Sequence, residues 1–331
     1  MRQILSLNRK WAFSKAATAV PTEIDNRWDF VNLPHSWNNI DGQDGGNDYF
    51  RGTAHYAQKL SRADLPEGAR YYLEFLGANS SADVYLNGKH LAHHDGGYST
   101  WRVNITDALE MENLLVVAVD NAANDRVYPQ VADFTFYGGL YRGVNLIVVP
   151  ESHFDLDYYG GPGIKVTPTI EGDNAKVEVE VYVTGGRLGQ EIRYTLLDKE
   201  GNIVAETTAN DQKAVFTLEN VHKWHGRKDP YLYTAKAELV EGGESIDTVS
   251  TRLAAVATKS TLSGVLSLTA KNILSVAYPA IRTAGVWAMP CCPSTIKRIW
   301  NTSAKWARPP FVLPTISTTS ISTICVTSTA R

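Results

Sequence analysis

The first 253 residues carry apolar runs of strand length only, and this feature limits the folds that the chain can adopt. The runs are rich in Val, Leu and Tyr, and Gly, Asn and Asp bound them, which is the signal for strands and turns. No long apolar stripe with the 3.6-residue helical period interrupts them. Short strands with regular turns predict an all-β sandwich. The clearest runs are YYLEFLGA (71–78), ADVYLNGKHL (82–91), NLLVVAVDN (113–121) and GVNLIVVP (143–150).

Asn87-Gly88 is the strongest short hairpin signal in these runs, because both residues tolerate a positive φ in a two-residue turn. A second set of strands begins near Glu151. Two segments, EIRYTLLDKEGNIVAE and YLYTAKAELVEGGESIDTVSTRL, each have the pattern of strand, turn and strand. In AKVEVEVYV, apolar and polar residues alternate, which predicts a strand with one buried face. These strands predict an immunoglobulin-like sandwich of roughly 100 residues. The buried face is predicted to hold Val177, Val179, Val181 and Val183, and the other face Glu178, Glu180 and Tyr182.

Charge is distributed unevenly along the chain, although the net charge is only −3. From Ala254 to Arg331 there is no Asp or Glu, and the eight Lys and Arg of this segment give it a charge of +8. The preceding residues therefore carry −11. The basic residues are scattered and not clustered, which is a poor electrostatic footprint for nucleic acid. We therefore expect no nucleic-acid partner.

All three cysteines lie in this last segment, so no disulfide framework holds the first 253 residues. We expect Cys291, Cys292 and Cys325 to be incidental and not metal ligands. The stretch MRQILSLNRKWAFSK lacks an apolar region as long as that of a signal peptide, and no run of about 18 apolar residues predicts a membrane span. The sequence therefore predicts a cytoplasmic protein without a membrane partner.

Seven segments occur in an order and at a spacing that resemble one known family. Five of them resemble the N-terminal jelly-roll domain of the β-galactosidase/β-glucuronidase family of glycoside hydrolases (family 2). Two resemble the immunoglobulin-like domain that follows it, and the resemblance covers about three quarters of the chain. The segments are VNLPHSWN (31–38), YFRGTAHY (49–56), ADVYLNGKHLAHHDGGYSTW (82–101), VDN (119–121), DFTFYGGLYRGV (133–144), HFDLDYYGGPGI (153–164) and WHGRKDPYLYTAKAEL (224–239).

The resemblance implies a jelly-roll, galactose-binding-like sandwich over residues 1–150 and an immunoglobulin-like sandwich over residues 151–253. The family follows these domains with a (β/α)₈ barrel. Residues 254–331 do not resemble that barrel, and we expect them to be a disordered tail.

The aromatic and histidine motifs have structural explanations as well as functional ones. The four tryptophans of residues 1–150 could stack on sugars. We expect most of them in the core, because aromatic side chains dominate burial. His93 and His94 are neighbours on a strand and should point to opposite faces, so they are not expected to share a metal ion. Gly138-Gly139 is not followed by a helix and is interpreted as a tight turn, not a phosphate loop. The tryptophans are Trp11, Trp28, Trp37 and Trp101.

Sugar contacts are implied by the resemblance at one place. In the family, an acid and an Asn on the jelly-roll reach toward the sugar in the neighbouring barrel. By position, Asp133 and the segment that contains Asn47, Asp48, Tyr49 and Arg51 resemble those contacts. A β-glycoside sugar is the ligand that this resemblance implies.

Catalysis in the family needs two glutamates on the barrel, one that protonates the leaving oxygen and one that attacks the anomeric carbon with retention of configuration. Both lie well beyond position 254 in the family pattern, and no Glu follows that position here. We therefore predict no catalytic residue, cofactor or metal in the chain, and no hydrolysis of glycosides by it.

We interpret residues 254–331 as translated out of frame. For VLPTISTTSISTICVTS, codons can be chosen such that the same bases, read one base earlier, encode LAHYQHDQYFYDLCDE, which resembles the first barrel helix of the family. In the same way VAYPAIRTA (276–284) gives RGVSRHQDR, the barrel-entry motif, and ATKSTLSG (257–264) gives SYEIDPER. The crossing lies near Leu253 and Ala254. The frame change belongs either to the organism or to the sequence record.

Three classes of function stay open at this point. The chain is interpreted first as the N-terminal part of a β-galactosidase-type glycoside hydrolase, inactive by itself. The alternatives are a carbohydrate-binding module that acts alone and a fragment that associates with itself or docks on other subunits of the family. The sugar that it would recognise is not predicted, because the residues that distinguish galactosides from glucuronides lie mainly on the barrel.

Overall fold

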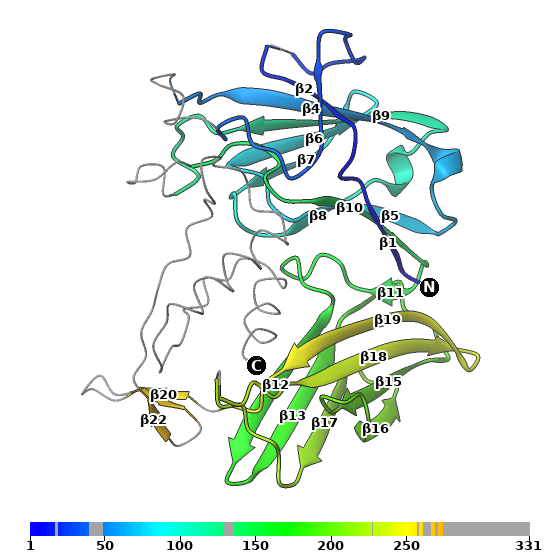
Figure 1. The fold of residues 1–331 in the computed structure, drawn as a ribbon. Helices are drawn as coiled ribbons and strands as arrows, with labels where there is room; N and C mark the ends of the chain where they lie inside the picture. Colours follow the sequence, from blue (N-terminus) through cyan, green and yellow to red (C-terminus); the bar gives the residue numbers. More distant parts are fainter. Residues whose placement is uncertain are drawn as a thin grey trace. The chain divides into compact units, whose positions relative to one another are not determined.

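The computed structural model describes residues 1–16, 19–39, 49–128, 136–226, 228–256, 258–260, 266–268 and 271–273. The described residues divide into two compact units, one of Gln3–Val149 and one that joins Met1–Arg2 to the described residues from Pro150 onward. Strands dominate both units (Figure 1), and the described residues contain no α-helix. The all-β fold class predicted from the sequence is therefore confirmed.

The first unit is a sandwich of two antiparallel sheets (Figure 1). The larger sheet has six strands in the order β3-β2-β4-β9-β6-β7, and the smaller has four in the order β1-β10-β5-β8. Two 3₁₀ turns, at Arg62–Asp64 and Thr106–Ala108, connect strands. The strands are β1 (Gln3–Ser6), β2 (Trp11–Ser14), β3 (Asp29–Val31), β4 (Thr53–Ser61), β5 (Arg70–Phe75), β6 (Ser81–Leu86), β7 (Lys89–Asp95), β8 (Trp101–Asn104), β9 (Glu112–Asp120) and β10 (Val144–Val149).

The hairpin predicted at Asn87-Gly88 is confirmed. These two residues join β6 to β7, which pair antiparallel from Leu86 and Lys89 at the turn to Ser81 and Asp95. Asn87 has φ 53° and Gly88 has φ 79°, the left-handed conformation that a two-residue turn requires. The Asn87 amide also holds the turn to the neighbouring strand β9, since its Oδ1 accepts a hydrogen bond from Leu114 N at 2.9 Å.

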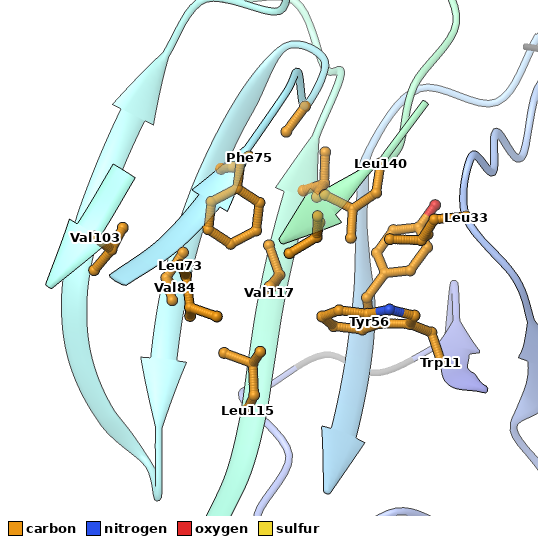
Figure 2. Packing of buried hydrophobic residues seen from close by; sticks show 14 of the residues in the cluster. Trp11, Leu33, Tyr56, Leu73, Phe75, Val84, Val103, Leu115, Val117 and Leu140 are labelled. Carbon is orange, nitrogen blue, oxygen red and sulfur yellow. The ribbon is translucent and has the colours of Figure 1, made fainter. Parts of the chain in front are cut away.

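The core of the first unit lies between the two sheets. Figure 2 shows Leu73 and Phe75 of β5 close to Val84 and Val117 of the larger sheet, and Trp11 close to Tyr56. Alternate residues of each strand supply this layer, as expected for strands with one buried face.

Three of the four tryptophans discussed above belong to this core: Trp11, Trp37 and Trp101 are almost fully buried. Trp28 is half-buried and packs on the outer side of the larger sheet, beside Ala57 and Val116. The expectation that most of them serve the core is confirmed.

The second unit contains a three-stranded sheet of order β12-β13-β17 and a four-stranded sheet of order β16-β15-β18-β19. A separate two-stranded sheet pairs β11 with β14. The two main sheets enclose a separate apolar core, which includes Phe154, Tyr194 and Phe216. The strands are β11 (His153–Phe154), β12 (Ile164–Glu171), β13 (Asn174–Val181), β14 (Val183–Thr184), β15 (Gln190–Leu197), β16 (Ile203–Ala209), β17 (Lys213–Leu218), β18 (Tyr233–Glu241) and β19 (Glu244–Leu253).

The alternation predicted in AKVEVEVYV is confirmed over β13. Val177, Val179 and Val181 are buried, and the glutamates between them are not. Val183, the fourth predicted member of this face, is only half-buried because it belongs to the separate short strand β14.

Beyond Leu253 the second core continues for two residues. Ala255 is buried in it, and its carbonyl oxygen accepts a hydrogen bond from Trp224 N at 3.1 Å. Within the segment for which the sequence predicts no fold, the structure describes a small antiparallel sheet. Its strands are β20 (Thr258–Ser260), β21 (Leu266–Leu268) and β22 (Lys271–Ile273). The three cysteines lie outside the described residues.

Candidate functional site

Two buried asparagine amides connect the loops at one end of the first sandwich. Asn121 directly follows β9, and Asn38 follows β3 in the chain. Asn121 Nδ2 donates to Asn38 Oδ1 at 3.2 Å, and Asn38 Nδ2 donates to the carbonyl oxygen of Phe50 at 2.9 Å. The backbone N–H groups of Gly138 and Gly52 donate to Asn38 Oδ1 and Asn121 Oδ1, at 2.8 and 2.9 Å. We call Asn38 and Asn121 the amide pair.

The amide pair fixes three chain segments in one arrangement. Both side chains are almost completely buried, so each polar atom left without a partner would cost about 1–3 kcal/mol. Their hydrogen bonds therefore hold the segments at Phe50–Gly52 and Gly138 against the ends of the strands.

Gly138 lies so close to this pair that no side chain fits. A Cβ built there would lie 2.3 Å from Trp37 Cζ2 and 2.6 Å from Asn121 Nδ2. Gly139 forms an isolated antiparallel bridge with Asn79. The tight turn predicted at Gly138-Gly139 is therefore wrong, because these glycines allow close backbone packing and not a reversal of the chain.

Two of the five predicted sugar contacts lie at this amide pair. Arg51 Nε donates to the carbonyl oxygen of Asn121 at 2.8 Å, and the Arg51 guanidinium lies 5.7 Å from the centre of the Tyr49 ring. The Tyr49 hydroxyl donates a short hydrogen bond to the carbonyl oxygen of Phe136. The structure thus brings Tyr49 and Arg51 together. The other three predicted residues, Asn47, Asp48 and Asp133, lie outside the described residues.

Asn38 and Asn121 were not predicted as site residues. Both lie in segments that carry the family resemblance, VNLPHSWN and VDN, but their pairing joins positions 83 residues apart. No local pattern in a single sequence shows such a contact. The only signal was the presence of an Asn at the end of each segment.

A second polar pair, His35 and Tyr56, lies in the aromatic part of the core. His35 Nδ1 and the Tyr56 hydroxyl are 2.8 Å apart. Burial lowers the pKa of His35 to about 4 and raises the pKa of Tyr56 above its ordinary value. The histidine is therefore neutral at pH 7 and accepts the tyrosine proton in a hydrogen bond. The pair stabilises the fold and is not set up to transfer protons at neutral pH.

His93 and His94 have separate environments, as predicted from their position on β7. His93 lies 2.9 Å from Asp83 and 3.2 Å from Asp95, and the two carboxylates contribute to raising its pKa. His94 instead stacks on Trp101, with ring centres 4.7 Å apart. In the part of the chain that the structure describes, no three metal-ligating side chains form a group.

Two family models match the chain. The model of the glycosyl hydrolase 2 galactose-binding domain-like family matches residues 48–133, and that of glycosyl hydrolases family 2 matches residues 162–254. The first contains Tyr49, Arg51 and Asn121, and the second contains most of the second sandwich. The chain belongs to glycosyl hydrolase family 2.

Characterised relatives agree with this assignment. The family 2 chain is 31% identical over 269 residues to a β-glucuronidase of Bacteroides fragilis, which covers 75% of the chain and 37% of the relative. A β-galactosidase of Thermoanaerobacter pseudethanolicus is 24% identical over 268 residues, which cover 74% of the chain and 34% of that enzyme. The chain thus spans little more than a third of the length of these curated relatives.

Solved structures show the same fold. The crystal structure of an FMN-binding β-glucuronidase from Facaelibacterium prausnitzii L2-6 matches with a TM-score of 0.86 and 31% identity, over 99% of this chain and 51% of the other. A β-glucuronidase 2 of Bacteroides uniformis matches with a TM-score of 0.86 at 24% identity. The jelly-roll and immunoglobulin-like sandwiches expected from the sequence are thereby confirmed as the N-terminal domains of this family 2 chain.

Beside the amide pair, Arg51 supplies a guanidinium and Tyr49 an aromatic ring. Such groups can bind the hydroxyl or carboxylate groups of a sugar. Hydrolysis by this family needs a carboxylic acid and a carboxylate on either side of the glycosidic bond. Among the described residues at the amide pair there is no such pair of carboxylates.

Proposed function

We propose that residues 1–253 are the sugar-contacting and supporting domains of a glycoside hydrolase that acts on β-glycosides of glucuronic acid or galactose. The first sandwich contributes Tyr49 and Arg51 to sugar recognition, together with Asn47, Asp48 and Asp133. The immunoglobulin-like sandwich supports the catalytic domain. We also propose a cytoplasmic location, because no cysteine occurs in these 253 residues.

One observation carries the sugar-contacting role: the amide pair fixes the backbone from Phe50 to Gly52, and this segment holds Arg51. Arg51 Nε is committed to the Asn121 carbonyl oxygen, which fixes the orientation of the guanidinium. A guanidinium recognises a carboxylate through two parallel hydrogen bonds, which suits the acid group of a glucuronide. The 31% identity to a β-glucuronidase supports the same class of sugar.

Titration calorimetry tests this role. The purified chain is expected to bind methyl β-D-glucuronide more tightly than methyl β-D-galactoside, with a millimolar dissociation constant, because the barrel side of the site is missing from the described residues. Arg51→Lys keeps the charge but loses the fork geometry and is expected to remove the preference for the glucuronide. Lys59→Arg, on β4, is the control. Absence of heat with both sugars would count against the role.

The same proposal predicts that the 331-residue chain does not hydrolyse glycosides. Residues 254–331 contain no Asp or Glu, so they cannot supply the acid and the nucleophile of the family. We attribute this composition to a change of reading frame near Leu253 and Ala254. Resequencing the gene around codons 250 to 256 tests the attribution directly.

Restoring the frame gives the matching activity test. A gene whose restored frame after codon 253 continues through the whole barrel is expected to encode a protein that releases nitrophenol from nitrophenyl β-D-glucuronide or β-D-galactoside. The 331-residue chain, purified in parallel, is expected to release none above the buffer rate. Turnover by the 331-residue chain would refute the inactivity.

A further inference from the structure

A cluster of three tyrosines lies on the second sandwich, in a different unit from the amide pair. The rings of Tyr158 and Tyr182 stack with their centres 4.1 Å apart and their planes 20° apart. Tyr159 meets Tyr158 edge to face at 4.9 Å. Tyr159 is 91% exposed, and the other two rings are half-buried. We call these three residues the tyrosine cluster.

The loop that carries Tyr158 and Tyr159 is held by hydrogen bonds. Asp155 Oδ1 accepts the backbone N–H groups of Asp157 and Tyr158, at 2.6 and 2.9 Å. Its Oδ2 accepts the Thr184 hydroxyl at 3.1 Å. Backbone bonds then attach Asp155 N to the Tyr182 carbonyl oxygen at 2.8 Å. The tyrosine cluster is therefore set in position before any ligand arrives.

The backbone at Tyr159 is in the left-handed region, with φ 46°. For a residue with a bulky side chain this conformation costs about 1–2 kcal/mol. Burial of the ring does not offset this cost, because the ring is exposed. Strained backbone that the fold maintains at an exposed side chain is a feature of binding surfaces.

Charged residues border the tyrosine cluster along the outer face of the sheet β12-β13-β17. Tyr182 follows Glu178 and Glu180 at the two-residue spacing that places all three on one face. Lys165 Nζ lies 2.9 Å from Glu180, and Lys213 Nζ lies 2.7 Å from Glu178. The tyrosine cluster thus lies next to paired charges.

This chemistry favours a sugar over a protein partner. The cores of protein interfaces are depleted of charged residues, and a stable interface needs about 800 Å² on each partner. Here three aromatic residues are followed by four charged ones on the same face. A pyranose ring needs only one or two aromatic faces for its C–H groups and a few charged or polar groups for its hydroxyls. The family to which the chain belongs is one of glycosyl hydrolases.

We propose that the tyrosine cluster binds a pyranose unit of an oligosaccharide or polysaccharide. The site lies in the second unit and shares no residue with the amide pair of the first. The exposed ring of Tyr159 packs on the sugar, and Lys165 and Glu180 bind its hydroxyl groups. Such a site retains polymeric substrate on the protein without taking part in bond cleavage.

Affinity electrophoresis of the 331-residue chain tests the site. The gels contain soluble β-galactan, glucuronoxylan or hyaluronan as probes. Migration is expected to be retarded by at least one of them. Tyr159→Ala should weaken the apparent affinity by about tenfold, and Tyr159→Phe should preserve it because the ring remains. Leu188→Ala is the matched control, since Leu188 is fully exposed in the same unit.

The outcomes separate this site from the one in the first sandwich. Arg51→Lys should leave the retardation unchanged, and Tyr159→Ala should leave the calorimetric binding of methyl glycosides unchanged. The proposal is overturned if no polysaccharide retards the chain, or if Tyr159→Ala migrates like the parent. It is also overturned if the parent forms a dimer in size-exclusion chromatography that Tyr159→Ala abolishes, because the surface would then serve self-association.

Discussion

At the scale of single residues, the second unit contains a buried ion pair. Asp247 is fully buried and lies 2.9 Å from Arg2, whose side chain is also largely buried. Its Oδ2 additionally accepts the Phe154 N–H at 2.8 Å. Arg2 returns a hydrogen bond to the Phe154 carbonyl oxygen at 2.7 Å. Asp247 and Arg2 thus bind the backbone N–H and the carbonyl oxygen of Phe154 in β11.

Asp247→Ala is expected to destabilise the second unit by about 3–5 kcal/mol, because it leaves the Arg2 charge without its partner in a buried place. Urea unfolding monitored by circular dichroism measures the change. Asp173→Asn is the control: it removes the partner of Lys223 in an exposed ion pair and should change the stability little. Equal effects of the two substitutions would contradict the role of Asp247.

His35 gives the first unit a pH dependence with a definite sign. Its pKa is about 4 in the folded chain, against an ordinary value of 6.5. Between these pH values the unfolded chain binds a proton that the folded chain does not, so stability decreases as the pH falls. The loss is about 1.4 kcal/mol for each pH unit in this window, and none is expected above it. Burial lowers the pKa of His55 as well, which adds a loss of the same sign.

Thermal unfolding of the parent and of His35→Gln between pH 7 and pH 4 isolates the contribution of His35. Glutamine can still accept the hydrogen bond from Tyr56, but it does not titrate. The variant is expected to lose less stability than the parent over this range. The loss caused by His55 is expected to be the same in both proteins. Parallel pH profiles would show that His35 is not the titrating group.

At the scale of elements, two glycines play different physical roles. Gly88 lies in the β6–β7 hairpin with φ 79°, and no atom lies within 4 Å of a Cβ built on it. Gly138 has ordinary φ but no room for a side chain beside the amide pair. We therefore expect Gly88→Ala to cost about 1 kcal/mol through backbone strain alone. Gly138→Ala should cost about 3 kcal/mol, because it displaces Trp37 and Asn121.

Chemical denaturation of the two variants measures this difference. Gly138→Ala should also abolish sugar binding at the first site, whereas Gly88→Ala should leave it intact. If both variants lose similar stability, the close approach at Gly138 is not what holds the loops.

Local patterns predicted the elements well, and long-range contacts could not be predicted. The turn at Asn87-Gly88 and the alternation in β13 depend on residues within a few positions of each other, so one sequence shows them. The amide pair depends on a contact between segments that only the folded sandwich brings together. Tyr159 adopts a left-handed φ that its residue type disfavours, so its sequence gives no signal for it. The candidate site of the first sandwich was therefore only partly predictable from the sequence.

At the scale of the whole molecule, two sandwiches with separate cores account for the described structure up to Val256. Each encloses its own buried apolar cluster, so each is expected to fold on its own contacts. If the residues after Leu253 are read out of frame, selection has not shaped them to pack on either core. Their removal should then leave the stability of both sandwiches unchanged.

A chain that ends at Val256 tests this expectation. The end point keeps Ala255, which is buried in the second core and bonded to Trp224. We expect urea unfolding of this shorter chain to match that of the 331-residue chain to within about 0.5 kcal/mol, the usual limit for changes that remove no specific interaction. We also expect less aggregation on heating, because apolar runs such as SGVLSLTAKNILSVAYPAI are removed. A loss of several kcal/mol would show that residues 257–331 pack on the sandwiches and were selected to do so.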